Sequence, residues 1–148
     1  MDYTHMEEDL IRDESLRLRT YRCSKGYLTI GVGHKITPTD RIDEGDTISL
    51  EAAGLFLSRD IATALGTANT VFGRGRFESM TDARQRAITN MIFNLGSEKF
   101  AGFRRMITAI KEHRWDDAEL ECLDSAYAKQ VGNRAKRVAY QLKTGRDL

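Results

Sequence analysis

The sequence has one proline, two cysteines and no hydrophobic run long enough to cross a membrane. Cys23 and Cys122 are too few for a disulfide framework or a zinc site, although a single bond between them stays open. The first eight residues contain neither a basic region nor an apolar stretch, so we expect no signal peptide and synthesis in a cytoplasm. We expect no metal ion and no cofactor.

A net charge of either sign is also nearly absent, because 23 Lys and Arg oppose 22 Asp and Glu. This near-balance argues neither for nor against a nucleic-acid partner. The charges are unevenly placed, however, with 11 acidic and 7 basic side chains in residues 1–51 and 1 acidic and 6 basic in residues 126–148. The basic segment is either a solvated helix face or a surface for an anionic polymer.

The chain does have enough apolar residues for a packed core, since 41% of its 148 residues are hydrophobic. A first helix is expected at about His5–Asp13, with Met6, Leu10 and Ile11 facing inward. Alternating polarity then predicts a strand over Leu16–Arg22.

A turn at Ser24–Gly26 is expected to lead into a return strand over Tyr27–His34. Gly31 and Gly33 in that strand suggest a bend or a close approach of backbone. The sequence therefore predicts a small antiparallel sheet.

Ser49 is a plausible N-cap for a long helix that ends near Thr67 or Asn69. Its expected inward stripe is Leu50, Ala53, Leu57, Ile61, Ala64 and Leu65. Further helices are predicted at Thr81–Leu95, Phe103–His113, Trp115–Leu123 and Asn133–Thr144.

These patterns indicate an α+β fold in a single domain, 1–148. A sheet lobe (about 15–48) would be joined by a connecting helix (about 49–69) to a helical lobe (about 70–148, with the first helix). Glu14 lies between the first helix and the sheet, at a junction where a cleft would form. A carboxyl group there suits general-acid chemistry, although a solvated glutamate at a helix end is the commoner arrangement.

Several motifs, in this order, resemble those of the lysozymes of T-even phages, and they cover nearly the whole chain. They are Asp13–Leu18, Tyr21, Gly26–His34, Ala101–Phe103, Arg114–Ala118, Asn133–Val138 and Thr144–Gly145. The resemblance implies a lysozyme-like fold and hydrolysis, with inversion, of the β-1,4 bond between N-acetylmuramic acid and N-acetylglucosamine in peptidoglycan.

The family's active site places a glutamate, an acidic residue and a threonine where this chain has Glu14, Cys23 and Thr29. The resemblance implies that Glu14 protonates the leaving oxygen and Thr29 holds the attacking water. Cys23 departs from the family pattern. Its thiolate could orient the water, aided by Arg22 and Lys25, it could attack the sugar directly, or it could be idle.

The resemblance also assigns supporting roles. Arg134 matches an arginine that faces the catalytic glutamate, and His34 is expected to form a structural pair with Asp60. The matched saccharide-contact positions are Phe93, Lys35, Met106 and Glu121, of which the last three differ in type from the family. Cys122 is expected in the core.

The favoured function is an endolysin, a phage muramidase that waits in the host cytoplasm until a holin-type pore admits it to the wall in the periplasm. Peptidoglycan is the expected partner, with no nucleic acid, no stable membrane insertion and a monomeric state. A lytic transglycosylase, in which Glu14 serves as both acid and base, and a non-catalytic peptidoglycan-binding protein stay open as alternatives.

Overall fold

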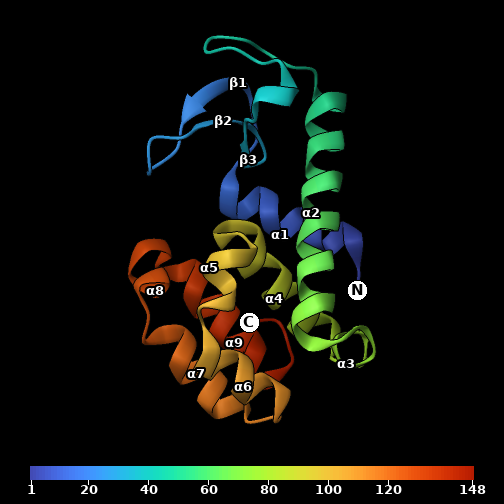
Figure 1. Ribbon diagram of the computed structural model, residues 1–148, viewed down its shortest axis with the longest axis vertical. Coiled ribbons are helices and arrows are strands. Elements are labelled where there is room, and N and C mark those ends of the chain that lie inside the picture. Colours follow the sequence, from blue (N-terminus) through green and yellow to red (C-terminus); the bar gives the residue numbers. More distant parts are fainter. The chain divides into compact units, whose positions relative to one another are not determined.

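The computed structural model describes all of residues 1–148, in two compact units. The sheet unit is Glu7–Ala62, and the helical unit is Met1–Met6 with Thr63–Leu148. A three-stranded sheet lies in the first, and the second is built from helices (Figure 1). These elements confirm the predicted α+β class. No helix combines the length and the apolar character that a membrane span requires.

Helix α1 (Tyr3–Glu14) starts earlier than predicted and ends one residue later. Met6 and Leu10 are fully buried, as expected from their spacing of four residues on one helix face. The prediction for Ile11 is wrong, because it is 41% exposed. It follows Leu10 directly and is therefore rotated by about 100° away from that face.

The sheet has the order β1-β2-β3, with both neighbouring pairs antiparallel. Its strands are β1 (Arg17–Arg22), β2 (Leu28–Gly31) and β3 (His34–Lys35). The single return strand predicted over Tyr27–His34 is therefore wrong, because the chain turns between β2 and β3. Gly31 and Gly33 have φ angles of 68° and 61°, which allow this turn and bear out the bend that the two glycines suggested.

The segment after β3 covers the free edge of β1. It contains a short 3₁₀ helix, η1 (Pro38–Asp40), and then returns to the sheet. The amide of Thr20 donates to the carbonyl of Asp46 at 3.1 Å, and the amide of Ile48 donates to that of Leu18 at 2.8 Å. These bonds occupy backbone groups of an edge strand that would otherwise be open to pairing.

Helix α2 (Leu50–Phe72) has the predicted cap, since the hydroxyl of Ser49 accepts a hydrogen bond from the amide of Ala52 at 3.0 Å. The helix runs past the predicted end near Asn69. Four members of the predicted apolar stripe are buried and Leu65 is partly buried, but Leu50, in the first turn, is 64% exposed.

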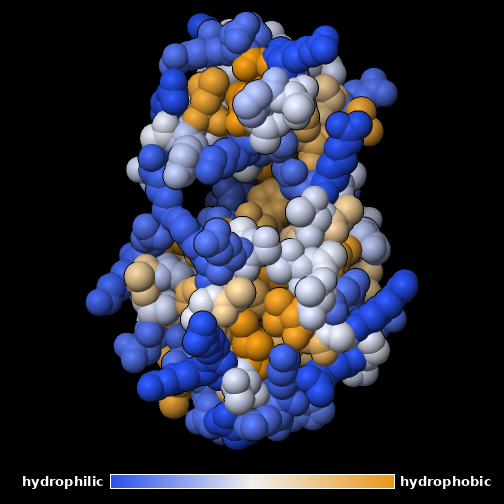
Figure 2. Space-filling view, viewed as in Figure 1, coloured by the Kyte–Doolittle hydropathy of each residue, from blue (hydrophilic) through white to orange (hydrophobic).

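The core of the helical unit surrounds α4 (Asp82–Leu95), which is buried on most sides as predicted. Thr81 caps its start, and Gly96 follows its last residue with a φ of 83°. Cys122 is fully buried in this core, as expected. The remaining helices are α3 (Arg74–Glu78), α5 (Ser97–Ala101), α6 (Arg104–Lys111), α7 (Trp115–Leu123), α8 (Ala126–Val131) and α9 (Asn133–Thr144). On the face drawn in Figure 2, hydrophilic residues predominate around small apolar patches.

Candidate functional site

Glu14 is the last residue of α1, and the chain reverses immediately after it. Ser15 has a φ of 67°, and its amide donates to the carbonyl of Ile11 at 2.9 Å. A non-glycine residue in this left-handed region costs about 1–2 kcal/mol, so the surrounding structure has to maintain it. This turn fixes the place where Glu14 leaves the helix.

The carboxyl group of Glu14 lies against the backbone of Gly33, in the turn between β2 and β3. A Cβ atom built on Gly33 would be 2.7 Å from Oε2 of Glu14 and 2.8 Å from its Cδ. Only a residue without a side chain permits so close an approach. The turn that splits the predicted return strand therefore packs against the candidate catalytic acid.

Cys23 begins the turn that joins β1 to β2. Its amide donates to the carbonyl of Tyr27 at 3.0 Å, and its carbonyl accepts from the amide of Gly26 at 2.8 Å. The backbone amides of Lys25, Tyr27 and Gly26 and the side chain of Thr29 lie close enough to the sulfur to stabilise a negative charge on it. The half-buried sulfur is thus surrounded by donors.

These donors favour the thiolate form of Cys23. Partial burial raises the pKa of the Cys23 thiol, but the hydrogen bonds from the amides and from Thr29 outweigh this, and the pKa is lower than usual. The predicted help from Arg22 is not seen. Its guanidinium instead donates to the carbonyl of Gly26 at 3.1 Å and to Glu44 at 3.3 Å.

Thr29 lies on β2 and is 4% exposed. Its hydroxyl donates to the carbonyl of Tyr27 at 2.9 Å, and it is also a hydrogen-bond partner of the Cys23 sulfur. A hydroxyl has one proton to donate and two lone pairs that can accept. Thr29 can therefore bind the carbonyl and still accept a hydrogen bond.

Tyr21 was not assigned a role from the sequence, yet it connects the three candidate catalytic residues. It is the cross-strand partner of Thr29, and the guanidinium carbon of Arg17 lies 4.4 Å from its ring centroid. Burial raises the pKa of Tyr21, and the negative charge of Glu14 and of Cys23 raises it further against the opposing effect of Arg17. Tyr21 therefore lies within the electrostatic influence of Glu14 and Cys23 and pairs with Thr29 across the sheet.

His34 and Asp60 form the expected pair, with 2.7 Å between Nδ1 and Oδ2. The sequence missed the second partner, Asp40 of η1, whose Oδ2 lies 2.8 Å from Nε2 of His34. The imidazole also stacks on Phe56, with ring centroids 4.2 Å apart. No group of three or more His, Cys, Asp or Glu side chains is arranged to hold a metal ion.

Carboxylates act on the pKa of His34 from two elements, η1 and α2. Burial lowers this pKa, but the hydrogen bonds to Asp60 and Asp40 outweigh it and leave the pKa raised. The pKa of Asp40 is lowered, because the bonds from Thr37 and His34 outweigh its partial burial.

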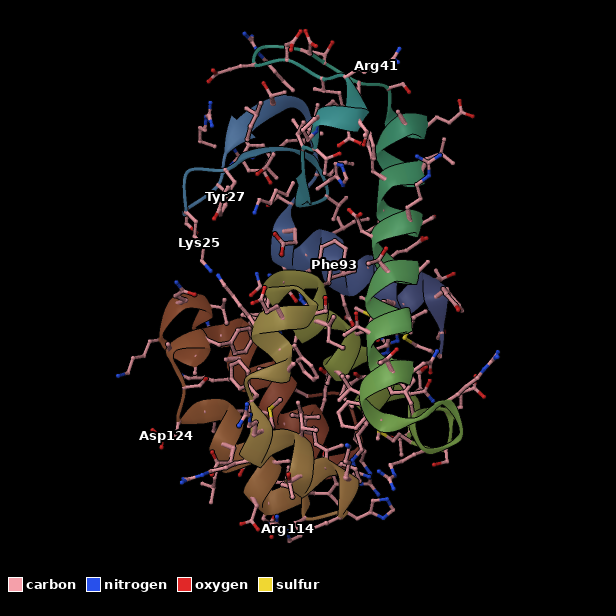
Figure 3. The ribbon with its side chains drawn as sticks, viewed as in Figure 1. Lys25, Tyr27, Arg41, Phe93, Arg114 and Asp124 are labelled. Atoms are coloured by element: carbon pink, nitrogen blue, oxygen red, sulfur yellow. The ribbon has the colours of Figure 1, made fainter.

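The other predicted site residues lie in the helical unit. Arg134 of α9 is buried, and its Nε donates to Oδ1 of Asn90 at 2.8 Å. Phe93 lies on α4, half-buried against the core (Figure 3). Met106, which is 1% exposed, and Glu121 line one surface pocket with Phe103 and Asp124 among others. The two cysteines are free, so the bond left open by the sequence is not formed.

Comparison with known proteins identifies the family. The family model described as phage lysozyme matches residues 12–144. The pre-baseplate central spike protein of Enterobacteria phage T4 is 31% identical over 95% of this chain, which spans 28% of that protein. The probable T4-type lysozyme 1 of Dictyostelium discoideum is 27% identical, with 93% of this chain and 94% of the relative covered. An endolysin of Acyrthosiphon pisum secondary endosymbiont phage 1 is 31% identical, with 83% and 78% covered. The chain therefore belongs to the phage lysozyme family.

Proposed function

We propose that this protein is a muramidase that hydrolyses the β-1,4 bond between N-acetylmuramic acid and N-acetylglucosamine in peptidoglycan. Family membership and the lysozyme and endolysin relatives support a lysozyme-type hydrolase acting on the cell wall. One observation supports the assignment of residues. The charges of Glu14 and Cys23 both act on Tyr21, which is the cross-strand partner of Thr29, and all four residues belong to the sheet unit.

In the proposed reaction the carboxyl group of Glu14 donates its proton to the glycosidic oxygen as the bond from that oxygen to the anomeric carbon breaks. A water molecule attacks the anomeric carbon from the opposite face, and the Cys23 thiolate accepts the proton that this water loses. The products are a muramic acid reducing end of inverted configuration and a free 4-hydroxyl group. The Cys23 thiol then loses its proton to solvent, and Glu14 regains one from solvent, so both groups return to their starting states.

Thr29 adjusts to the charge of Cys23. When the sulfur is a thiolate, the hydroxyl proton of Thr29 and the three backbone amides stabilise its negative charge. When the sulfur has taken a proton from water, the hydroxyl of Thr29 donates to the carbonyl of Tyr27 at 2.9 Å. Cys23 is more exposed than Thr29, which supports its assignment as the residue that meets the attacking water.

The first prediction concerns wall lysis by variants at these positions. Glu14→Gln should lower kcat at least about 100-fold, because no other group supplies the leaving-group proton. Cys23→Asp should retain lysis, because it restores the carboxylate of the family pattern, whereas Cys23→Ala should lose about tenfold or more. Glu8→Gln, an exposed residue of α1, is the matched control.

The pH profile tests the thiolate directly. The reaction needs Glu14 with its proton and Cys23 as the thiolate at the same time, so the activity of the wild type, relative to its maximum, should extend to more alkaline pH than that of Cys23→Asp, whose carboxyl group titrates lower than a thiol. Equal activity of wild type and Cys23→Ala would remove the thiol from the mechanism. Anhydromuramic ends would show a transglycosylase, and binding to peptidoglycan without release of muropeptides would show a non-catalytic relative.

We further propose that the protein acts as a monomeric endolysin that reaches the wall from the host cytoplasm through a holin-type pore. The endolysin among its relatives motivates this proposal. Cells that express the chain alone should lyse only after their membrane is permeabilised. Lysis without permeabilisation would contradict the dependence on a pore.

A further inference from the structure

A lysine is held over an aromatic ring beside the candidate catalytic residues. The Nζ atom of Lys35 lies 3.4 Å from the ring centroid of Tyr27. Both residues are exposed, Tyr27 to 47%, and Tyr27 projects from the β1–β2 hairpin near Lys25 (Figure 3). A cation over an aromatic face is attracted by the ring quadrupole. The ring therefore restricts a side chain that would otherwise move freely.

This pair is tied to Thr29 in two ways. Lys35 is the cross-strand partner of Thr29 in the β2–β3 pair, so their side chains lie on one face of the sheet. The carbonyl of Tyr27 accepts the hydroxyl proton of Thr29 at 2.9 Å. The ammonium group is consequently fixed close to the residue that, in the proposed function, positions water.

The ammonium group of Lys35 contacts the ring of Tyr27 and is not paired with a carboxylate. Lys143 offers a contrast, because its ammonium pairs with Glu119 at 3.1 Å. A preorganised and unneutralised cation at the edge of a site suits an anionic group on the substrate.

We propose that Lys35, held by Tyr27, recognises a carboxylate carried by the muramic acid residue of the glycan and so determines substrate preference. This proposal rests on the proposed function. Peptidoglycan offers two sources of that group. The free carboxylates of the peptide stem are one, and the lactyl carboxylate that is exposed once the stem is removed is the other. N-acetylglucosamine carries no carboxylate.

Three substrates distinguish these sources: glycan strands with intact stems, strands stripped of stems by an amidase, and stripped strands whose lactyl carboxylates are coupled to methylamine. Lys35→Leu should raise KM about threefold on carboxylate-bearing strands, with kcat unchanged, because an exposed ion pair contributes modestly to binding in both ground and transition states. On the neutral amide strands the rise in KM should be clearly smaller, because those strands offer no carboxylate for the ammonium group to pair with. The carboxylated substrate that shows the loss identifies the source.

The variants separate charge from packing. Lys35→Arg and Tyr27→Phe should retain the preference, since charge and ring are kept, while Tyr27→Leu should weaken it. Added salt should reduce the preference of the wild type and not that of Lys35→Leu. Lys111→Leu, an exposed lysine at the end of α6, is the control for loss of one charge.

An equal effect of Lys35→Leu on charged and neutral strands, or no effect on either, would overturn the proposal. Binding to the same strands in the Glu14→Gln background, measured by calorimetry, separates it from the proposed function. Hydrolysis without dependence on Lys35 defeats this inference alone. If the wild type cleaves no strand but its affinity for the strands still depends on Lys35, the proposed function is contradicted and this inference is not.

Discussion

The carboxyl group of Glu14 depends on a residue that has no side chain. Gly33 has a φ of 61°, and a Cβ atom there would lie 2.7 Å from Oε2 of Glu14. Gly33→Ala should therefore cost about 1–2 kcal/mol in backbone strain and also displace the carboxyl group. We expect kcat to fall at least about tenfold, because small misplacement of a catalytic group is costly.

Gly45→Ala is the matched control for Gly33→Ala. Gly45 has a φ of 95°, but a Cβ atom there would meet nothing within 4 Å. Its thermal unfolding should shift as that of Gly33→Ala does, with kcat retained. If both variants lost stability equally and both kept full kcat, the packing of Gly33 against Glu14 would have no role in positioning the acid.

At the scale of elements, His34 joins β3 to η1 and α2 through its bonds to Asp40 and Asp60. Asp40→Asn should destabilise the protein by about 1–2 kcal/mol near pH 5.5, because a charge-assisted hydrogen bond is lost. The raised pKa of His34 gives stability that is full below its unfolded value of about 6.5 and is lost as pH rises through the folded value.

The lowered pKa of Asp40 determines the pH below which this pair stops stabilising the protein. Its contribution is present above the unfolded value of about 3.9 and is lost as pH falls through the folded value. Urea unfolding of wild type and Asp40→Asn should thus differ most between these limits and least near about pH 9. Asp43→Asn, in the same loop, is the control. A difference independent of pH would exclude the imidazolium as the cause.

The sequence predicted the longer elements well because their signals are local. Periodic apolar residues and a terminal glycine located α9, and the pattern of α7 gave its limits correctly. Helices of five or six residues, such as α3 and α8, are too short to show a period. Gly31 and Gly33 signalled the bend, but alternation alone did not show that the strand is divided.

The sequence predicted which residues form the candidate site, but it did not predict the groups that surround them. Glu14, Cys23 and Thr29 were named from their resemblance to a known pattern. The donors around the Cys23 sulfur are mostly backbone amides. Every sequence supplies such amides, so no residue type in this one predicts their position. Asp40 reaches His34 from a loop whose course depends on tertiary contacts.

For the whole molecule, the concentration of basic residues after residue 126 does not form one free surface. Lys143 pairs with Glu119, and Arg134 is buried beside Asn90. These two residues are therefore not available to an anionic polymer, whereas Lys129, Lys136 and Arg146 are exposed, so both interpretations of the segment stay predictions.

Each unit contains one cysteine, Cys23 in the sheet unit and Cys122 in the helical unit, so the reactivity of each thiol probes one unit. Burial raises the pKa of Cys122 to about 12, whereas that of Cys23 is lowered. Because the thiolate is the reactive form, iodoacetamide at neutral pH should add to the folded protein once, at Cys23. A second adduct should appear only when urea opens the helical core. Mass spectrometry of the intact protein measures both.

The adduct at Cys23 should abolish wall lysis in step with labelling, because it removes the thiolate and fills the space that water would occupy. Cys23→Ala should take up no adduct while folded, and its residual lysis should survive the reagent. Labelling of Cys122 as fast as Cys23 would mean that the helical core opens readily in native buffer. Full lysis by a singly labelled protein would mean that the sulfur does not meet the attacking water, and Glu14 would then act without it.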